Sequence, residues 1–231
     1  MRNILSDAKI DVATNKRGSI STGVRTESRK KRAAESFKTA TDALGHLTHG
    51  CHVFAITRGQ WSMIDAILAV LDQSGPAHVS CWTWTVAEYE VQCMERLMRD
   101  ERLLSGRLVI DLSGRSTNKK HFEEVIRRWQ TAFGPNSIRY VVNHAKVATV
   151  WNDHWRFLLR GSMNLNFNPR FENFDLSEGC AGFDLVREIE DELPVLPDTC
   201  THEQAKAASQ VGNAFSAEQL ALFKPVKIWA R

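Results

Sequence analysis

Four side chains that bind or attack phosphate occur close together in the second half of the sequence. His144 and Lys146 form a His-x-Lys pair, and Ser162 and Asn164 follow in a Gly-Ser-x-Asn run. Between them, β-branched and aromatic residues flank a polar turn at 152–154, which predicts a β-hairpin. If the turn is centred near Asp153, the numbers of residues that face each other across the hairpin sum to about 306–308. His144 would then lie opposite Ser162 or Asn164. Because side chains alternate along strands, the imidazole, ammonium, hydroxyl and amide converge on a candidate phosphate site.

These side chains suit attack on a phosphodiester. A neutral imidazole is a nucleophile near neutral pH, which fits His144 for attack on phosphorus. Charge on the non-bridging oxygens must be met by fixed donors, and Lys146, Ser162 and Asn164 supply them.

A nucleophilic imidazole also needs an acceptor, usually a carboxylate, at its far nitrogen. Asp175 is the nearest downstream carboxylate on an expected strand, in the run Asn-Phe-Asp-Leu that begins at residue 173. Glu172 and Asp153 are weaker candidates for the same role.

The motifs together resemble the signature of the phospholipase D superfamily. The resemblance rests on His-x-Lys at 144–146, Gly-Ser-x-Asn-Leu at 161–165 and Asn-Phe-Asp at 173–175. The interval from Gly161 to Asp175 is similar to that of the cardiolipin-synthase-like branch, with Asp175 in place of the usual Glu. Trp151 stands where the family has an Asp that is regarded as structural, and the hairpin is a few residues longer than in compact bacterial nucleases.

One His144 cannot be both the phosphorylated nucleophile and the acid that protonates the leaving oxygen. No other histidine lies in a His-x-Lys setting. The resemblance implies a solution, because single-motif members of the superfamily pair two identical sites about a two-fold axis. We therefore expect a homodimer with a phosphohistidine intermediate, and the mechanism requires no metal or other cofactor.

The remaining sequence predicts an α/β domain with a layered sheet flanked by helices. Strands are expected at 52–57, 78–85, 107–112 and 138–143, and helices at 34–47, 63–74, 86–104, 118–133, 183–193, 202–211 and 216–223. Strands ahead of the hairpin should be largely parallel, with ligands at their carboxyl ends. Arg115, in the loop after the third strand, is a candidate contact for a polyanion. The chain thus divides into a basic flexible arm (1–33), a phospholipase-D-like domain (34–200) and a C-terminal helical extension (201–231).

Composition limits where such a protein works. Hydrophobic residues make up 43% of the 231 residues, which supports a core. No apolar run approaches the roughly 20 residues needed to cross a bilayer, and the first residues lack a signal-like apolar stretch. Five cysteines without a Cys-x-x-Cys motif fit a reducing compartment, so we expect a cytoplasmic protein. A structural or surface role suits the cluster His46, His49, Cys51 and His52 better than zinc binding.

The charge is concentrated at the N-terminus. Residues 1–32 hold nine Lys/Arg and three Asp/Glu, a net +6, while the other 199 residues sum to −3. The compact block Arg29, Lys30, Lys31 and Arg32 suits a polyanion such as nucleic acid or an anionic membrane surface. A solubilising tail explains it equally well.

The motif alone does not select a substrate. The small size, the basic arm and the lack of a membrane anchor favour a metal-independent endonuclease acting on DNA or RNA. Trp82, Trp84, Trp151 and Trp155 are candidates for stacking on bases, with core packing as the alternative. Two rival hypotheses are a phospholipase-D-like protein that binds nucleic acid without cutting it, and a phospholipase or phosphatidyl transferase.

Overall fold

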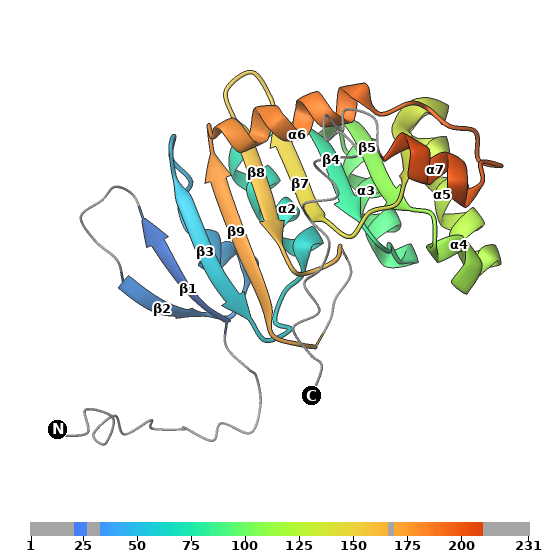
Figure 1. Ribbon diagram of the computed structural model, residues 1–231. Helices are drawn as coiled ribbons and strands as arrows, with labels where there is room; N and C mark the ends of the chain where they lie inside the picture. The colour runs from blue at the N-terminus through green and yellow to red at the C-terminus, as the bar shows by residue number, and fades with distance from the viewer. Residues whose placement is uncertain (1–20, 27–32, 166–168, 210–231) are drawn as a thin grey trace, which may run out of the picture.

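The computed structural model describes residues 21–26, 33–165 and 169–209 and contains one mixed sheet (Figure 1). The sheet has nine strands in the order β2-β1-β3-β9-β8-β7-β4-β5-β6. The strands are β1 (Ser21–Thr26), β2 (Ala33–Phe37), β3 (His52–Thr57), β4 (Ala77–Thr83), β5 (Leu103–Asp111), β6 (Ile138–Val141), β7 (Lys146–Trp151), β8 (Arg156–Gly161) and β9 (Glu172–Glu178). Pairing is parallel within β4-β5-β6 and antiparallel elsewhere. The α/β class is confirmed, and parallel pairing ahead of the hairpin is limited to these three strands.

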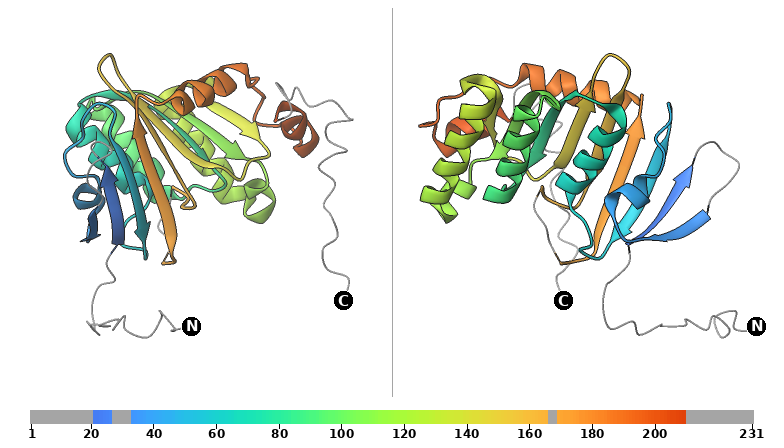
Figure 2. Two further views of the ribbon diagram at one scale, coloured as in Figure 1. Left: turned by 60° about the vertical axis from the view of Figure 1, so that its left-hand side comes forward. Right: turned by 180° about the vertical axis from the view of Figure 1, so that it is seen from behind.

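Helices pack on both faces of this sheet. They are α1 (Ala40–Leu44), α2 (Met63–Ser74), α3 (Glu88–Arg99), α4 (Gly114–Thr117), α5 (Lys119–Phe133), the 3-10 turn η1 (Pro135–Ser137), α6 (Ala181–Glu192) and α7 (His202–Ala208). Helices α2, α3 and α5 lie on one face, whereas α6 crosses the other face over β8, β7 and β4 (Figures 1 and 2). None of the helices in the described part of the chain is long and apolar enough to span a membrane.

The main core lies between the sheet and the layer formed by α2, α3 and α5. In β9, Phe174 and Leu176 are fully buried on this side, and the edge of Trp61 meets the Phe174 ring at a centroid distance of 5.0 Å. Because side chains alternate along a strand, Asp175 between them points to the opposite face, the one that α6 partly covers. This alternation decides which carboxylates can reach the candidate site.

The predicted hairpin is confirmed as β7 and β8. Lys146 pairs with Gly161, so paired residue numbers sum to 307, inside the expected range. The side-chain oxygen of Asn152 accepts hydrogen bonds from the backbone N–H groups of His154 and Trp155, both at 3.0 Å. A short polar side chain that closes a turn in this way explains why the chain reverses here.

The predicted starts of two helices, at 63 and 118, are confirmed to within one residue. Ser62 is the N-cap residue of α2, and Asp65 closes the cap because its carboxylate accepts from the Ser62 backbone N–H and hydroxyl, at 2.7 and 2.8 Å. Helix α5 begins one residue later than expected, at Lys119, because Asn118 is its N-cap and its Oδ1 accepts from the His121 N–H at 3.2 Å. Both are side-chain caps of orphan N–H groups at a helix start.

The expected helix at 34–47 is wrong in its first half. Residues 33–37 form β2, and only Ala40–Leu44 is helical, capped by Thr39. Strand β1 likewise lies within the segment expected to be a flexible arm, where it pairs with β3 and β2. Strand pairing, of β2 with β1 and of β1 with β3, overrides local propensity in both cases. The basic block at 29–32 and the expected helix at 216–223 lie outside the described residues.

Candidate functional site

The motif residues lie at or beside the start of β7, the end of β8 and the start of β9, strand ends that form the lower edge of the sheet in Figure 1. Strand β7 runs antiparallel to β4 and β8, so its first residue, Lys146, lies beside the last residues of those strands. Trp84 directly follows β4, Gly161 ends β8, and Glu172 begins β9 next to it. The carboxyl ends of β4 and β8 and the starts of β7 and β9 thus meet at one place, where α/β sheets bind ligands.

Lys146 anchors this edge. Its side chain is 8% exposed, and its Nζ donates to the backbone carbonyl of His144 at 2.7 Å. Burial lowers the pKa of Lys146, and the nearby Glu172 carboxylate opposes that shift. His144 itself is exposed just ahead of β7, with its ring centroid 6.4 Å from that of Trp84. The imidazole is therefore open to a substrate while its backbone is tied to a buried ammonium.

Ser162 joins the end of β8 to the start of β9. Its N–H donates to the Asn173 carbonyl at 3.1 Å, and its Oγ accepts from the Asn173 N–H at 3.0 Å. The same hydroxyl donates to the Glu172 carboxylate. The structure thus brings together Lys146, Ser162 and Glu172, and it makes Glu172 the carboxylate of this cluster.

Asn164 lies two residues beyond Ser162, close to the start of α2. The neighbouring Leu165 carbonyl accepts from the Ile64 N–H at 3.4 Å. The Oδ1 atom of Asn164 is buried, and no donor reaches it from the part of the chain that the structure describes. Since buried polar atoms are almost always paired, this orphan acceptor suits a group that arrives with a ligand.

The prediction that Asp175 orients His144 does not fit the geometry of a single chain. Asp175 lies on the face of the sheet opposite to Lys146, and its two oxygens are bonded to His52 Nε2 and Arg160 Nε, each at 2.7 Å. The His52 and Arg160 side chains are half exposed. Asp175 therefore belongs to a surface ion-pair row across β3, β9 and β8, and Glu172 takes its place near the motif.

Arg115 is not free to receive a polyanion either. Its guanidinium donates to the backbone carbonyls of Cys200, at 2.8 Å, and Asp198, and lies over the rings of Phe122 and Tyr140. The side chain holds the segment before α7 against α5. The other predicted nucleic-acid contacts, Arg29, Lys30, Lys31 and Arg32, lie outside the described residues.

The four tryptophans considered for base stacking separate into two groups. Trp82 donates to Glu190 at 2.5 Å, Trp151 lies under the Arg187 guanidinium at 4.1 Å, and Trp155 stacks on His49 and Phe157. Trp84 alone of the four is near His144, and it remains 44% exposed. Trp151 thus has a packing role at the far end of β7 from Lys146.

No cluster of three or more metal-binding side chains occurs within the described ranges. His49 packs on Trp155 at a centroid distance of 4.2 Å, and His52 is bonded to Asp175. These two histidines, which the sequence places in a cluster with His46 and Cys51, therefore have structural partners.

No family model and no curated protein matches this chain. Among solved structures, it is similar to a phosphatidylserine synthase from Haemophilus influenzae Rd KW20, with a TM-score of 0.47 and 11% identity over 68% of this chain and 43% of the other. It is also similar to a polyphosphate kinase from Porphyromonas gingivalis, with a TM-score of 0.43 and 14% identity over 65% of this chain and 27% of the other. The chain thus spans less than half the length of either protein, and its function must be argued from the motif and the geometry.

Sequence reasoning ranked Glu172 too low, and it named Trp84 only as one of four tryptophans that could stack on bases. Once Lys146 pairs with Gly161, and Gly161 with Phe174, the residue two places before Phe174 must share the Lys146 face. The sequence signal for Glu172 is therefore its position two residues before a core phenylalanine, which places both side chains on one face of the strand. For Trp84 the signal is its place just after a parallel strand.

Proposed function

We propose that this chain is a metal-independent phosphodiesterase of the phospholipase-D-like class that cleaves nucleic acid in a homodimeric site. One observation carries the proposal: the buried Lys146 ammonium is fixed on the His144 backbone at the sheet edge that also holds Ser162 and Glu172. An exposed imidazole beside a fixed cation and a hydroxyl is a suitable arrangement for attack on a phosphate ester.

In the proposed first step, a ring nitrogen of His144 forms a bond to phosphorus, and the ester bond to the leaving oxygen breaks. That oxygen takes a proton from His144 of the partner subunit. The partner imidazole then removes a proton from water, and the water oxygen displaces His144 from phosphorus. The balance of protons closes without a metal, and each histidine ends in its starting form.

Lys146, Ser162 and Asn164 hold the phosphate in this scheme. A Lys ammonium has three N–H donors, and the His144 carbonyl uses one of them. Burial strengthens its attraction for phosphate oxygens, because the local dielectric is lower than that of water. Glu172 keeps the ammonium charged and orients the Ser162 hydroxyl.

The decisive assay follows cleavage of labelled single- and double-stranded DNA and RNA in excess chelator. We expect His144→Ala to lose turnover and to unfold like the wild type. His154→Ala, in the exposed turn of the same hairpin, is the matched control and should keep full activity. Full cleavage by the His144 variant would refute the assignment.

The dimer is tested by mixing. Sedimentation should give a species of two chains, and heterodimers of wild type with His144→Ala should lose turnover, because each proposed site needs both imidazoles. Cleavage by a species that sediments as a single chain would refute the composite site.

A second function, binding of nucleic acid without cleavage, is favoured by the position of Asp175. That carboxylate is hydrogen-bonded to His52 and Arg160, so within one chain it does not orient the His144 ring. Such a protein would shift a gel and release no product in the assay above. Release of choline or glycerol from phospholipid vesicles would instead identify a phospholipase or phosphatidyl transferase.

A further inference from the structure

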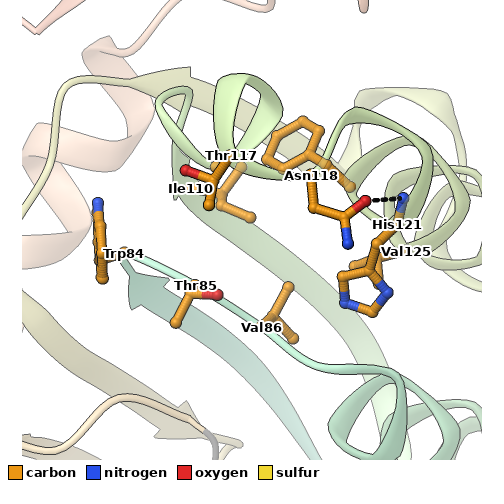
Figure 3. Close-up of a pocket in the computed structure, with 10 residues that line it drawn as sticks. Trp84, Thr85, Val86, Ile110, Thr117, Asn118, His121 and Val125 are labelled. Carbon is orange, nitrogen blue, oxygen red and sulfur yellow. Dashed lines mark hydrogen bonds between the residues drawn. The ribbon is translucent and has the colours of Figure 1, made fainter.

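A cavity opens at the carboxyl ends of β4 and β5, and Trp84 is among the residues that line it (Figure 3). Its volume is about 240 Å³. Apolar side chains make most of the wall, namely Val86, Ile110, Phe122 and Val125. Drug-sized ligands occupy pockets of about 300–1,000 Å³, so this cavity suits a smaller group of one or two rings.

Polar groups stand at the rim of the cavity and give it an orientation. Asn118 Oδ1 accepts from the His121 N–H at 3.2 Å, which leaves the Asn118 amide N–H donors toward the cavity (Figure 3). The His121 ring and the Thr85 hydroxyl line the same space. A few polar groups around an apolar floor are typical of sites that read the edge of a flat ring.

Trp84 links this cavity to His144. Its ring lines the cavity, its Nε1 donates to Ser113 at 3.0 Å, and its centroid is 6.4 Å from that of His144. The hydrogen bond fixes the orientation of an indole that is otherwise 44% exposed. A substrate with its phosphate at His144 would therefore pass Trp84 as its next group enters the cavity.

The charge at the mouth of the cavity favours an anionic chain over an acyl chain. Asn118, the N-cap of α5, lines the cavity, and α5 begins with Lys119 and Lys120 and has no acidic residue in its first turn. Lys119 is paired with Glu123 at 3.8 Å, so the helix N-terminus and Lys120 carry the positive charge at this place. Successive phosphates of a nucleic acid strand would meet these charges, whereas a fatty acyl chain would leave the Asn118 and His121 groups unpaired.

We propose that this cavity binds one unstacked nucleobase next to the scissile phosphate, with Trp84 as its stacking platform and Asn118 as a donor to its edge. The proposal rests on the proposed nuclease function and makes a single-stranded or locally opened strand the substrate. An enzyme that takes a base out of a duplex must spend unpairing energy, which a single strand avoids.

The first test compares a short oligothymidylate with the same strand carrying abasic residues, by fluorescence anisotropy with the full chain in chelator. Removing the bases should weaken binding, and Trp84→Ala should weaken binding of the normal strand by roughly 5- to 100-fold. Trp84→Ala should bind the abasic strand as the wild type does, and Trp84→Phe should be intermediate. Equal loss on both strands would overturn the proposal, because it would show a general rather than a base-dependent effect.

The second test changes the edge contact without removing the helix cap. Asn and Asp cap helices about equally well, so Asn118→Asp should keep α5 and the thermal midpoint. It replaces N–H donors with an acceptor, which should weaken binding of oligothymidylate relative to oligocytidylate by about 3- to 10-fold. If the folded variant bound oligothymidylate and oligocytidylate with the same affinity ratio as the wild type, Asn118 would not contact the edge of the base.

These outcomes separate the pocket from the catalytic proposal. Cleavage of normal and abasic strands at equal rates and equal affinity would support the nuclease and overturn the base pocket. Base-dependent binding without cleavage would support the pocket and refute the nuclease. Phosphatidylglycerol vesicles that bind the wild type and lose affinity with Trp84→Ala would overturn the nucleobase in favour of an acyl chain.

Discussion

Gly161 is the position where a single methyl group should do most harm to the site. It lies in β8 between Lys146 of β7 and Phe174 of β9. A Cβ at Gly161 would overlap the carbonyl oxygen of Asn173 and lie 3.2 Å from its carbonyl carbon and 3.3 Å from Phe174 Cα. All three are backbone atoms, so no side chain can rotate away. The glycine of the Gly-Ser-x-Asn motif is thus required by the close approach of β9.

The cost of Gly161→Ala follows from that overlap. To clear it, β8 and β9 must separate by about 1 Å beyond their usual spacing of 4.7–4.9 Å. The Ser162 N–H to Asn173 carbonyl bond, now 3.1 Å, would then exceed hydrogen-bond range. Overpacking and the lost bond together should lower the free energy of unfolding by about 2–4 kcal/mol. A shift of about 1 Å in Ser162 should also lower kcat/KM by roughly 100-fold.

Urea unfolding and the chelator cleavage assay measure both effects. Gly182→Ala in α6 is the matched control, because its nearest contact is Leu158 Cδ2 at 2.9 Å, the movable end of a side chain. Alanine is also the better helix former by about 0.8–1.0 kcal/mol, which offsets that contact. We expect the control to stay within about 1 kcal/mol of the wild type and to keep its activity. A Gly161→Ala protein with wild-type unfolding and turnover would show that the β8–β9 register is wrong.

Three further predictions concern charged groups. Burial lowers the pKa of Lys146, so kcat/KM should decline at a lower alkaline pH than it would with a lysine of ordinary pKa. Lys146→Arg should move this decline to higher pH in a pH–rate profile. An unchanged alkaline decline would contradict the role of Lys146. Glu172→Gln should move the alkaline decline of kcat/KM to lower pH, because of these two carboxylates, Glu172 and Asp175, only Glu172 raises the pKa of Lys146. It should also lower turnover more than Asp175→Asn does. A larger loss with Asp175→Asn would restore Asp175 to the site. Burial raises the pKa of Glu90, so its negative charge destabilises the folded chain at neutral pH, and this cost disappears as the pH falls below 4.5, the ordinary pKa of a glutamate. Glu90→Gln keeps an acceptor for the Ala87 N–H and should raise the thermal midpoint more at neutral than at acidic pH. An equal rise at both pH values would contradict the burial of this charge.

What the sequence predicts well is local. The register of the hairpin follows from a turn that Asn152 closes, and the start of α2 follows from Ser62 and Asp65, three residues apart. The strands at 21–26 and 33–37 were missed because β1 forms against the edge of β3 and β2 forms against β1, which no local pattern reveals.

Asp175 was misplaced for a related reason. The sequence shows that Phe174 and Asp175, as neighbours in a strand, must lie on opposite faces of the sheet. It does not show which of the two shares a face with Lys146. That choice needs the register across two interfaces, β7 with β8 and β8 with β9. Once both are fixed, Gly161 and Phe174 lie in line with Lys146, and Asp175 falls on the far side of the sheet.

The burial of Lys146 explains why His-x-Lys is a structural unit as well as a pair of reactive groups. A buried ammonium without partners would be costly, and the His144 carbonyl supplies one at 2.7 Å. The same bond restrains the backbone that carries the imidazole, so the cation and the nucleophile are positioned relative to each other before a substrate arrives. Such preorganisation is what allows fixed donors to stabilise charge without reorganising during the reaction. Arginine keeps the charge but not the compact shape, so Lys146→Arg should retain binding of a phosphate and lose much of the turnover.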